Sequence, residues 1–178
     1  MNGRLVGIVI ILLALGVGGA IYYLQVYGFY REVPVTEIRP VQLITLADGT
    51  AQTVDQSDTR AIDADSSPIR YRSCFSTTLT AQAASAIYVP APNAEPRIAP
   101  GWFDCFDATA IGTAIEAGTM ATFLSVKNIA YGVDRVVALG ADGNGYSWHI
   151  LNQCGTKAYD GTVVGEECPP PPNRAATN

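Results

Sequence analysis

The chain has 178 residues, a formal net charge of −5 and a hydrophobic fraction of 48%. This length suits one folded domain beside one membrane-spanning helix. Acidic residues outnumber the 11 basic ones, which are scattered along the chain, so the composition excludes a nucleic-acid-binding surface. An acidic domain is better matched, electrostatically, to a cationic protein partner.

The first feature in chain order is an apolar stretch, residues 5–24, that holds no charged side chain. At ~1.5 Å per residue its length matches a hydrocarbon core of roughly 30 Å. A cleaved signal peptide has a shorter apolar core of ~7–15 residues. Five aromatic residues within 22–30 are typical of the interfacial belt of a retained span. We therefore predict a transmembrane signal anchor over residues 1–30, with cleavage at residues 18–20 as the alternative.

The charges beside this stretch predict its orientation. Arg4 and the amino terminus precede the span without a neighbouring acid, whereas Arg31 on the far side is next to Glu32. Positive charge is enriched on the cytoplasmic side of membrane spans. We expect a protein of the bacterial inner membrane, with a cytoplasmic N terminus and a periplasmic C-terminal domain.

Four small residues, Gly3, Gly7, Ala14 and Gly18, are separated by four, seven and four positions. This spacing places them near one face of a helix, where small side chains let a second helix approach closely in lipid. The pattern predicts a helix-packing face for an integral membrane partner. Gly and Ala are also common in membrane helices in general, which is the alternative reading.

The segment after the span is proline-containing and then turns back on itself. Residues 31–40 predict an extended stalk or a first edge strand, because Pro34 and Pro40 disfavour helix before them. Residues 41–46 and 50–54 predict a hairpin around Asp48-Gly49. The polar run 55–67 predicts a solvated loop, since its acids lack the spacing of a calcium-binding loop.

Residues 69–75 alternate polar and apolar side chains, which predicts a half-buried strand. Arg70 and Arg72 would share one face of it, either as contacts to an acidic partner or as charges that keep a strand edge soluble. Residues 80–86 predict a short helix and 88–106 an irregular loop. Its Trp102 and Phe103 are candidate partner contacts, although aromatic residues beside a cysteine more often fill a core.

The last third predicts one helix and three strands. Asp107 and Gly118 would cap a helix over residues 108–117, with Ile111 and Ile115 on its apolar face. Residues 121–126, 134–139 and 146–151 read as strands, the last two joined by a turn over 141–145. We predict an α+β domain over residues 41–168, mainly antiparallel, followed by a disordered, proline-rich tail over 169–178.

The four cysteines all follow the span and form no C-x-x-C motif. An even number of widely spaced cysteines favours disulfides in an oxidising compartment over a metal site. Three pairings are open, and loop-closure entropy favours Cys74–Cys105 with Cys154–Cys168.

Catalytic and cofactor motifs do not stand out in the sequence. His149 is the only histidine, and no G-x-S-x-G motif accompanies it, so we interpret it as structural. We expect no cofactor, no metal and no enzymatic activity. An anchored hydrolase would need a nucleophile and a base close to His149.

Residues 1–33, together with the CFST and WFDCF segments around Cys74 and Cys105, resemble a small uncharacterised alphaproteobacterial family of single-span proteins with a periplasmic domain. The resemblance implies a membrane location with a periplasmic domain, and it implies no activity. The main hypothesis is a non-enzymatic accessory subunit of a membrane complex, with a respiratory, cytochrome-linked assembly as the first candidate. The alternative is an anchored periplasmic ligand-binding or sensing domain that uses the loop 88–106.

Overall fold

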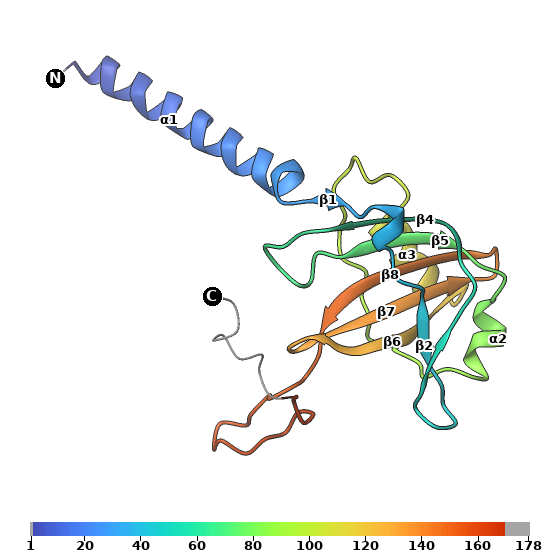
Figure 1. Ribbon diagram of the computed structural model, residues 1–178. Helices are drawn as coiled ribbons and strands as arrows, with labels where there is room; N and C mark the ends of the chain where they lie inside the picture. The colour runs from blue at the N-terminus through green and yellow to red at the C-terminus, as the bar shows by residue number, and fades with distance from the viewer. Residues whose placement is uncertain (1, 170–178) are drawn as a thin grey trace.

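The computed structural model describes residues 2–169. Helix α1 (Gly3–Tyr23) projects from a β-sheet domain and ends in a π-helical turn, η1 (Leu24–Gly28) (Figure 1). None of the residues of α1 is buried against the domain. Together α1 and η1 are long and apolar enough to cross a membrane, a property that signal sequences share.

The domain is built on a six-stranded antiparallel sheet, in which a two-residue strand from the anchor side forms one edge. The strand order is β1 (Arg31–Glu32), β4 (Ser57–Asp63), β5 (Arg72–Ser76), β8 (Asn144–Leu151), β7 (Val133–Gly140) and β6 (Met120–Ala130). A separate hairpin of β2 (Gln42–Ile44) and β3 (Ala51–Thr53) packs on the sheet through β2 and β6. A 3-10 turn, η2 (Val35–Glu37), links β1 to this hairpin.

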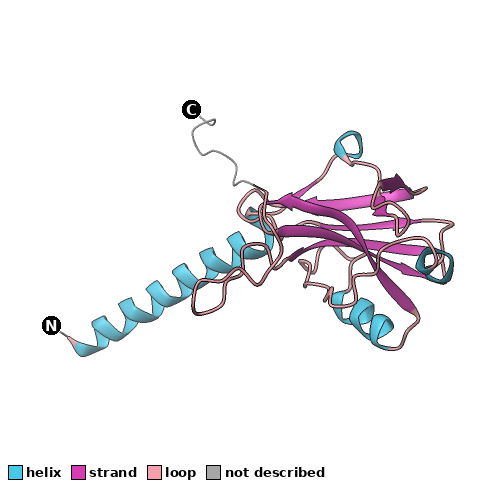
Figure 2. Ribbon diagram, turned by 90° about the horizontal axis from the view of Figure 1, so that it is seen from below, coloured by secondary structure: helices cyan, strands magenta, loops and turns pink. Residues whose placement is uncertain are grey.

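Two short helices cover the sheet, and their caps follow from the sequence. Thr80 accepts a hydrogen bond from the Ala83 amide at the start of α2 (Ala81–Ser85). The Asp107 carboxylate accepts two amide hydrogen bonds at the start of α3 (Ala108–Glu116). Figure 2 shows α3 lying on one side of the strands.

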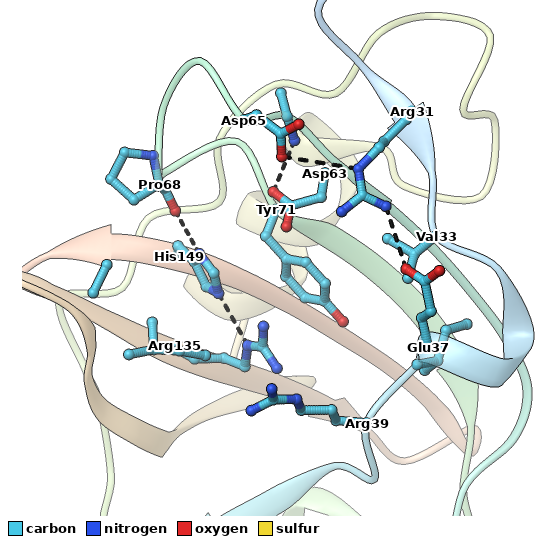
Figure 3. Close-up of a pocket in the computed structure, with 14 residues that line it drawn as sticks. Arg31, Val33, Glu37, Arg39, Asp63, Asp65, Pro68, Tyr71, Arg135 and His149 are labelled. Atoms are coloured by element: carbon cyan, nitrogen blue, oxygen red, sulfur yellow. Dashed lines mark hydrogen bonds and ion pairs between the residues drawn. The ribbon is translucent and has the colours of Figure 1, made fainter. Parts of the chain in front are cut away.

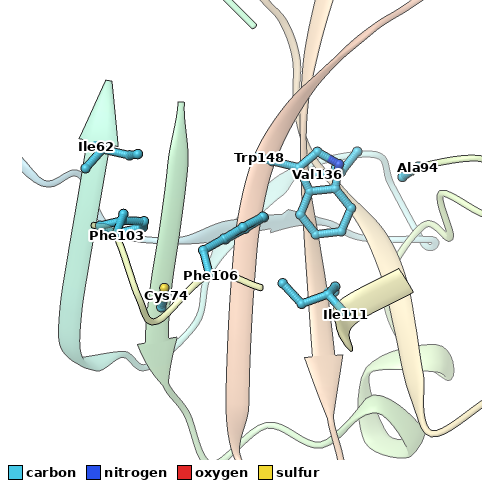
Figure 4. Close-up of a cluster of buried hydrophobic side chains, with 9 residues drawn as sticks. Ile62, Cys74, Ala94, Phe103, Phe106, Ile111, Val136 and Trp148 are labelled. Atoms are coloured by element: carbon cyan, nitrogen blue, oxygen red, sulfur yellow. The ribbon is translucent and has the colours of Figure 1, made fainter. Parts of the chain in front are cut away.

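The core has two parts, one on each face of the sheet. Trp148 and Val136 point to the face covered by α3 and the loop before it, where Phe106 and Ile111 pack against them (Figure 4). Val137, next along β7, points to the opposite face, where the β2–β3 hairpin and α2 cover it. Because both faces of this part of β7 are buried, residues 136–139 are a continuous apolar run rather than an alternating one.

All four cysteines are in disulfides. Cys74–Cys105 ties β5 to the loop before α3, and Cys154–Cys168 closes the segment after β8. These are the pairs that loop-closure entropy favours.

The predicted fold class, an N-terminal apolar helix followed by a mainly antiparallel α+β domain with disulfides, is confirmed. One local prediction differs from the structure. The predicted loop 55–67 contains β4, in which Ala61 and Ile62 are buried. Of the two alternatives for residues 31–40, the structure has the first edge strand, which residues 31–32 form by pairing with β4. Of the predicted tail, residues 170–178 lie outside the described residues.

Candidate functional site

The small-residue face of α1 is open. A methyl group added at Gly3, Gly7 or Gly18 would meet no other atom within 4 Å. Ala14 lies on the same exposed helix. Within residues 2–169, this face therefore has space for a neighbouring helix to approach the backbone.

The end of the helix is attached to the domain by two side chains from distant loops. The Trp102 indole Nε1 donates a hydrogen bond of 2.7 Å to the carbonyl oxygen of Val26, and its ring meets Tyr30 edge to face. Arg70 Nη2 donates to Gln25 Oε1 at 2.7 Å. We call this group of five residues, Gln25, Val26, Tyr30, Arg70 and Trp102, the anchor joint.

Arg70 is held in the anchor joint mainly by aromatic rings. Its guanidinium carbon lies 5.6 Å from the centre of the Phe29 ring and 5.4 Å from that of Tyr30. Its Nη1 atom is buried and has no hydrogen-bond partner in the described part of the chain. The negative faces of the two rings take the place of an acceptor for this cation.

The other two candidate partner contacts, Arg72 and Phe103, are buried, which corrects the prediction for them. Arg72 is 3% exposed, and its guanidinium donates to backbone carbonyl oxygens, including those of Arg97 and Ile69 at 2.8 Å. Burial lowers the pKa of Arg72 to about 10. Phe103 is 2% exposed and belongs to the core. Arg72 is buried because the backbone of residues 97–98 covers its guanidinium, and Phe103 because its loop packs onto the core of the sheet.

A cavity of about 520 Å³ opens on the domain close to where the chain leaves η1 (Figure 3). Its wall combines β1, η2, the loop between β4 and β5, the β6–β7 hairpin and β8. The lining side chains used below are Arg31, Glu37, Arg39, Asp63, Asp65, Tyr71, Arg135 and His149. We call it the Arg135 cavity. Its volume lies in the range of small-molecule sites, roughly 300–1,000 Å³.

Three side chains form a connected stack at the back of the cavity. The His149 Nδ1 atom lies 2.5 Å from the Pro68 carbonyl oxygen, which only accepts, so Nδ1 carries the proton. His149 Nε2 then accepts a hydrogen bond of 3.0 Å from Arg135 Nε. The Tyr71 ring stacks on His149 with 4.9 Å between centroids, and the Arg135 guanidinium lies 4.0 Å from the centre of the Tyr71 ring.

This arrangement keeps His149 neutral. Burial lowers the pKa of His149 to about 4, and the positive charges of Arg135 and Arg72 act in the same direction, against the bond to Pro68. Both ring nitrogens are engaged, so no lone pair is free to act as a base. Among the described residues, the Ser147 hydroxyl is buried without a hydrogen-bond partner, so it is not paired with His149.

The acidic side chains lie across the cavity from Arg135. Arg31 contacts Glu37 at 3.5 Å and Asp65 at 3.9 Å. The Asp63 carboxylate accepts a hydrogen bond from the Ala64 amide. Figure 3 shows the guanidinium groups of Arg39 and Arg135 on the same side of the cavity, away from these acids.

The cavity was not predicted from the sequence, although one part of its wall could have been. The turn over residues 141–145 sets the register that pairs Arg135 with His149 across β7 and β8. Tyr71 and Pro68 come from an irregular loop whose path has no sequence signature. The loop 88–106, the predicted binding segment, instead contributes Tyr88, Phe103 and Phe106 to the core.

Metal-ligating clusters are not found in residues 2–169, where no three His, Cys, Asp or Glu side chains converge. A protein-family model matches residues 41–169 of the chain, and it is described as a family of unknown function (DUF6446). No curated protein matches the chain. No solved structure matches it either.

Proposed function

The chain belongs to DUF6446, a family of unknown function, and we propose that it is a non-enzymatic accessory subunit of a larger integral membrane complex. In this proposal α1 is a single transmembrane anchor of the bacterial inner membrane. Its N terminus is cytoplasmic, and the sheet domain lies on the periplasmic side of the host complex.

The anchor joint carries the proposal. A domain that needs only tethering works on a flexible linker, whose ends move freely. Here Trp102 and Arg70 bind the last turn of the helix, and β1 enters the sheet within a few residues of it. The helix face and the domain surface are therefore held in one relative orientation, which suits a partner that contacts both.

The small-residue face supports lateral packing in the membrane. In lipid, helix association depends on close backbone approach rather than on the hydrophobic effect. No residue of α1 is buried, and the spacing of Gly7 and Gly18 places two small residues near one face of this open helix.

The charge of the domain supports the finer part of the proposal. After residue 30 the chain has 10 basic and 16 acidic residues, an excess that attracts cationic proteins. A respiratory host that works with a cationic cytochrome c is the assembly we propose first. The resemblance to alphaproteobacterial single-span proteins is consistent with that setting.

Mild solubilisation of native membranes tests the proposal. We expect the chain to migrate on native gels with a large complex, whose subunits mass spectrometry identifies. The double variant Gly7→Leu/Gly18→Leu should stay in the membrane fraction but lose this co-migration. Gly16→Leu/Gly19→Leu, which places the same side chains on roughly the opposite side of the helix, is the matched control. Migration of the unmodified chain alone as a monomer would overturn the accessory role.

The second candidate function is an anchored periplasmic domain that binds a small ligand. It is favoured by the Arg135 cavity, where Arg135 is held in place by His149 and Tyr71. The ligand would enter there, and not at the loop 88–106.

A further inference from the structure

Arg135 is set in position before any ligand arrives. Its Nε–H is bonded to His149, which is itself fixed by the Pro68 carbonyl oxygen, and its planar group lies against the Tyr71 ring. These contacts use one of the five guanidinium N–H groups. In the described part of the chain no carboxylate is bonded to the other four. A guanidinium group that its neighbours already hold in place loses little conformational entropy when its N–H groups bind an anion.

A second guanidinium lines the same cavity. Arg39 is exposed, and Figure 3 shows its group on the same side of the cavity as that of Arg135. Burial lowers the pKa of Arg135, the charges of Tyr71 and Asp63 raise it, and the positive charge of Arg39 lowers it by a smaller amount. Two neighbouring cations repel each other unless an anion lies between them. Of the acids that line the cavity, Glu37 and Asp65 are engaged by Arg31. Asp63 acts on Arg135 through its negative charge, but its carboxylate accepts its hydrogen bond from the Ala64 amide and not from a guanidinium.

From this arrangement we infer that the Arg135 cavity binds a phosphate group between the guanidinium groups of Arg135 and Arg39. Arginine forks match the oxygen edges of phosphate, and a tetrahedral anion offers separate edges to two forks. The cavity, at about 520 Å³, is larger than phosphate alone, so the ligand is a phosphate ester whose organic part fills the rest. This inference rests on the second candidate function, a ligand-binding domain, and not on the accessory role.

The phosphate ester has two sources with the same chemistry. A soluble phosphate monoester could diffuse in from the compartment. A phospholipid headgroup would also reach the cavity if α1 spans a bilayer, because the cavity wall includes Arg31, three residues after the end of η1. The binding group is the same in both cases, so the test compares the sources directly.

Calorimetric titration of the full chain in a neutral detergent tests the inference. The probes are inorganic phosphate, glycerol 3-phosphate, a short-chain phosphatidic acid, which is a phosphate monoester like glycerol 3-phosphate, and the matched diacylglycerol without phosphate. We expect saturable binding of at least one phosphate ester and none of the diacylglycerol. Tighter binding of the phospholipid than of glycerol 3-phosphate assigns the site to a headgroup, and the reverse assigns it to a soluble ester.

Three variants distinguish phosphate binding by the arginines of the cavity from a general attraction of anions to positive charge. Arg39→Gln, at an exposed position that leaves the fold intact, should weaken binding about tenfold or more, as loss of a charge-assisted hydrogen bond does. Arg135→Gln should do the same, and the nuclear magnetic resonance signal of the Arg135 Nε–H in the unmodified chain should shift on titration. Arg97→Gln removes an exposed arginine that does not line the cavity and should bind as before.

Several results would overturn the inference. They are no saturable binding of any phosphate probe, acetate binding as tightly as the phosphate esters, or unchanged affinity in Arg39→Gln. Equal losses of affinity in Arg97→Gln and Arg39→Gln would show that binding depends on the net charge of the domain and not on the cavity. Co-migration with a host complex is not involved in any of these measurements, so this inference and the accessory role fail separately.

Discussion

His149 shows how a single titratable side chain is placed in this domain. It is 6% exposed, donates a hydrogen bond from Nδ1 to the Pro68 carbonyl oxygen and accepts a hydrogen bond at Nε2 from Arg135. A protonated ring would lose the acceptor for Arg135 and place a second positive charge beside it. The folded state therefore favours the neutral ring, and burial lowers the pKa of His149 to about 4.

This lowered pKa predicts a loss of stability in mild acid. In the unfolded chain His149 takes up a proton near pH 6.5, whereas in the folded chain it does so only near pH 4. The unfolded state thus binds more protons between these values, so the free energy of unfolding falls as the pH falls from 6.5 to 4. The total loss from this residue is on the order of 3 kcal/mol. Denaturant unfolding of the full chain in this range, followed by near-ultraviolet circular dichroism, measures it.

His149→Gln is the matched variant, because an amide can still donate to the Pro68 oxygen and accept from Arg135 without titrating. Its free energy of unfolding should vary less with pH between 6.5 and 4 than that of the unmodified chain. Equal slopes for the two proteins would contradict the assignment of the acid effect to His149.

For single residues, the sequence predicts whether a side chain has a structural role better than it predicts which atoms that side chain contacts. A lone histidine without a second ligand or a nucleophile motif indicates a structural residue, and both its ring nitrogens are indeed engaged in the fold. Arg70 and Arg72 look equivalent in the sequence, yet one lies at the helix end and the other is buried under backbone carbonyl oxygens. That distinction depends on which distant segments pack over the two side chains, the helix end over Arg70 and residues 97–98 over Arg72, and side-chain alternation alone does not specify it.

The anchor joint is the contact between elements on which the fixed orientation of α1 depends. In Trp102→Phe the ring still packs beside Tyr30, but the hydrogen bond to the Val26 oxygen is lost. One such bond contributes about 1 kcal/mol. We expect amide hydrogen exchange over residues 24–33 to become about fivefold faster, as measured by mass spectrometry.

Tyr88→Phe serves as the comparison for this variant. It removes the hydroxyl that donates to Gln52 Oε1 at 3.0 Å, in a different part of the domain. Exchange over residues 24–33 should be unchanged in Tyr88→Phe. If Trp102→Phe also left that exchange unchanged, the joint would not depend on the indole.

The two disulfides should differ in what they stabilise. Cys74–Cys105 joins a central strand to the loop that supports α3, and its removal by Ala substitution at both positions should lower the free energy of unfolding by about 4 kcal/mol in the chain-entropy model. Cys154–Cys168 closes a segment after the last strand, outside both core clusters. Its removal should leave the unfolding of the sheet nearly unchanged and speed proteolysis within residues 152–168. Equal losses of stability in the two variants would contradict this division.

At the element scale, the strands and helices with strong local signals were predictable and the others were not. The β7–β8 turn, the Asp107 cap and the Asp48-Gly49 hairpin each follow from a few neighbouring residues. β4 has a polar, acid-containing sequence with an irregular register between Ser57 and Arg60. It becomes a strand because β5 and β1 pair with it on either side, and its own sequence does not encode that environment.

For the whole molecule, the fold class and the disulfide framework follow from the sequence, but the relation of anchor to domain does not. The proline-containing segment after the apolar stretch fits both a stalk and an edge strand, and its sequence does not choose between them. In the structure its first two residues are the edge of the sheet, and Trp102 and Arg70 contact the helix end from far along the chain. Contacts of that sequence separation have no local signature.

The pairing of β1 with β4 also has a consequence for solubility. Arg31 and Glu32 occupy part of the outer edge of β4, and the Val33 amide extends the pairing by donating to the Ala61 oxygen. A domain cut to begin at residue 36 would leave that edge bare, and bare edges recruit strands from other molecules. We expect this shortened domain to self-associate with rising concentration in light scattering, whereas one beginning at residue 29 should stay monomeric. The residues that leave the apolar helix thus also protect the sheet from aggregation.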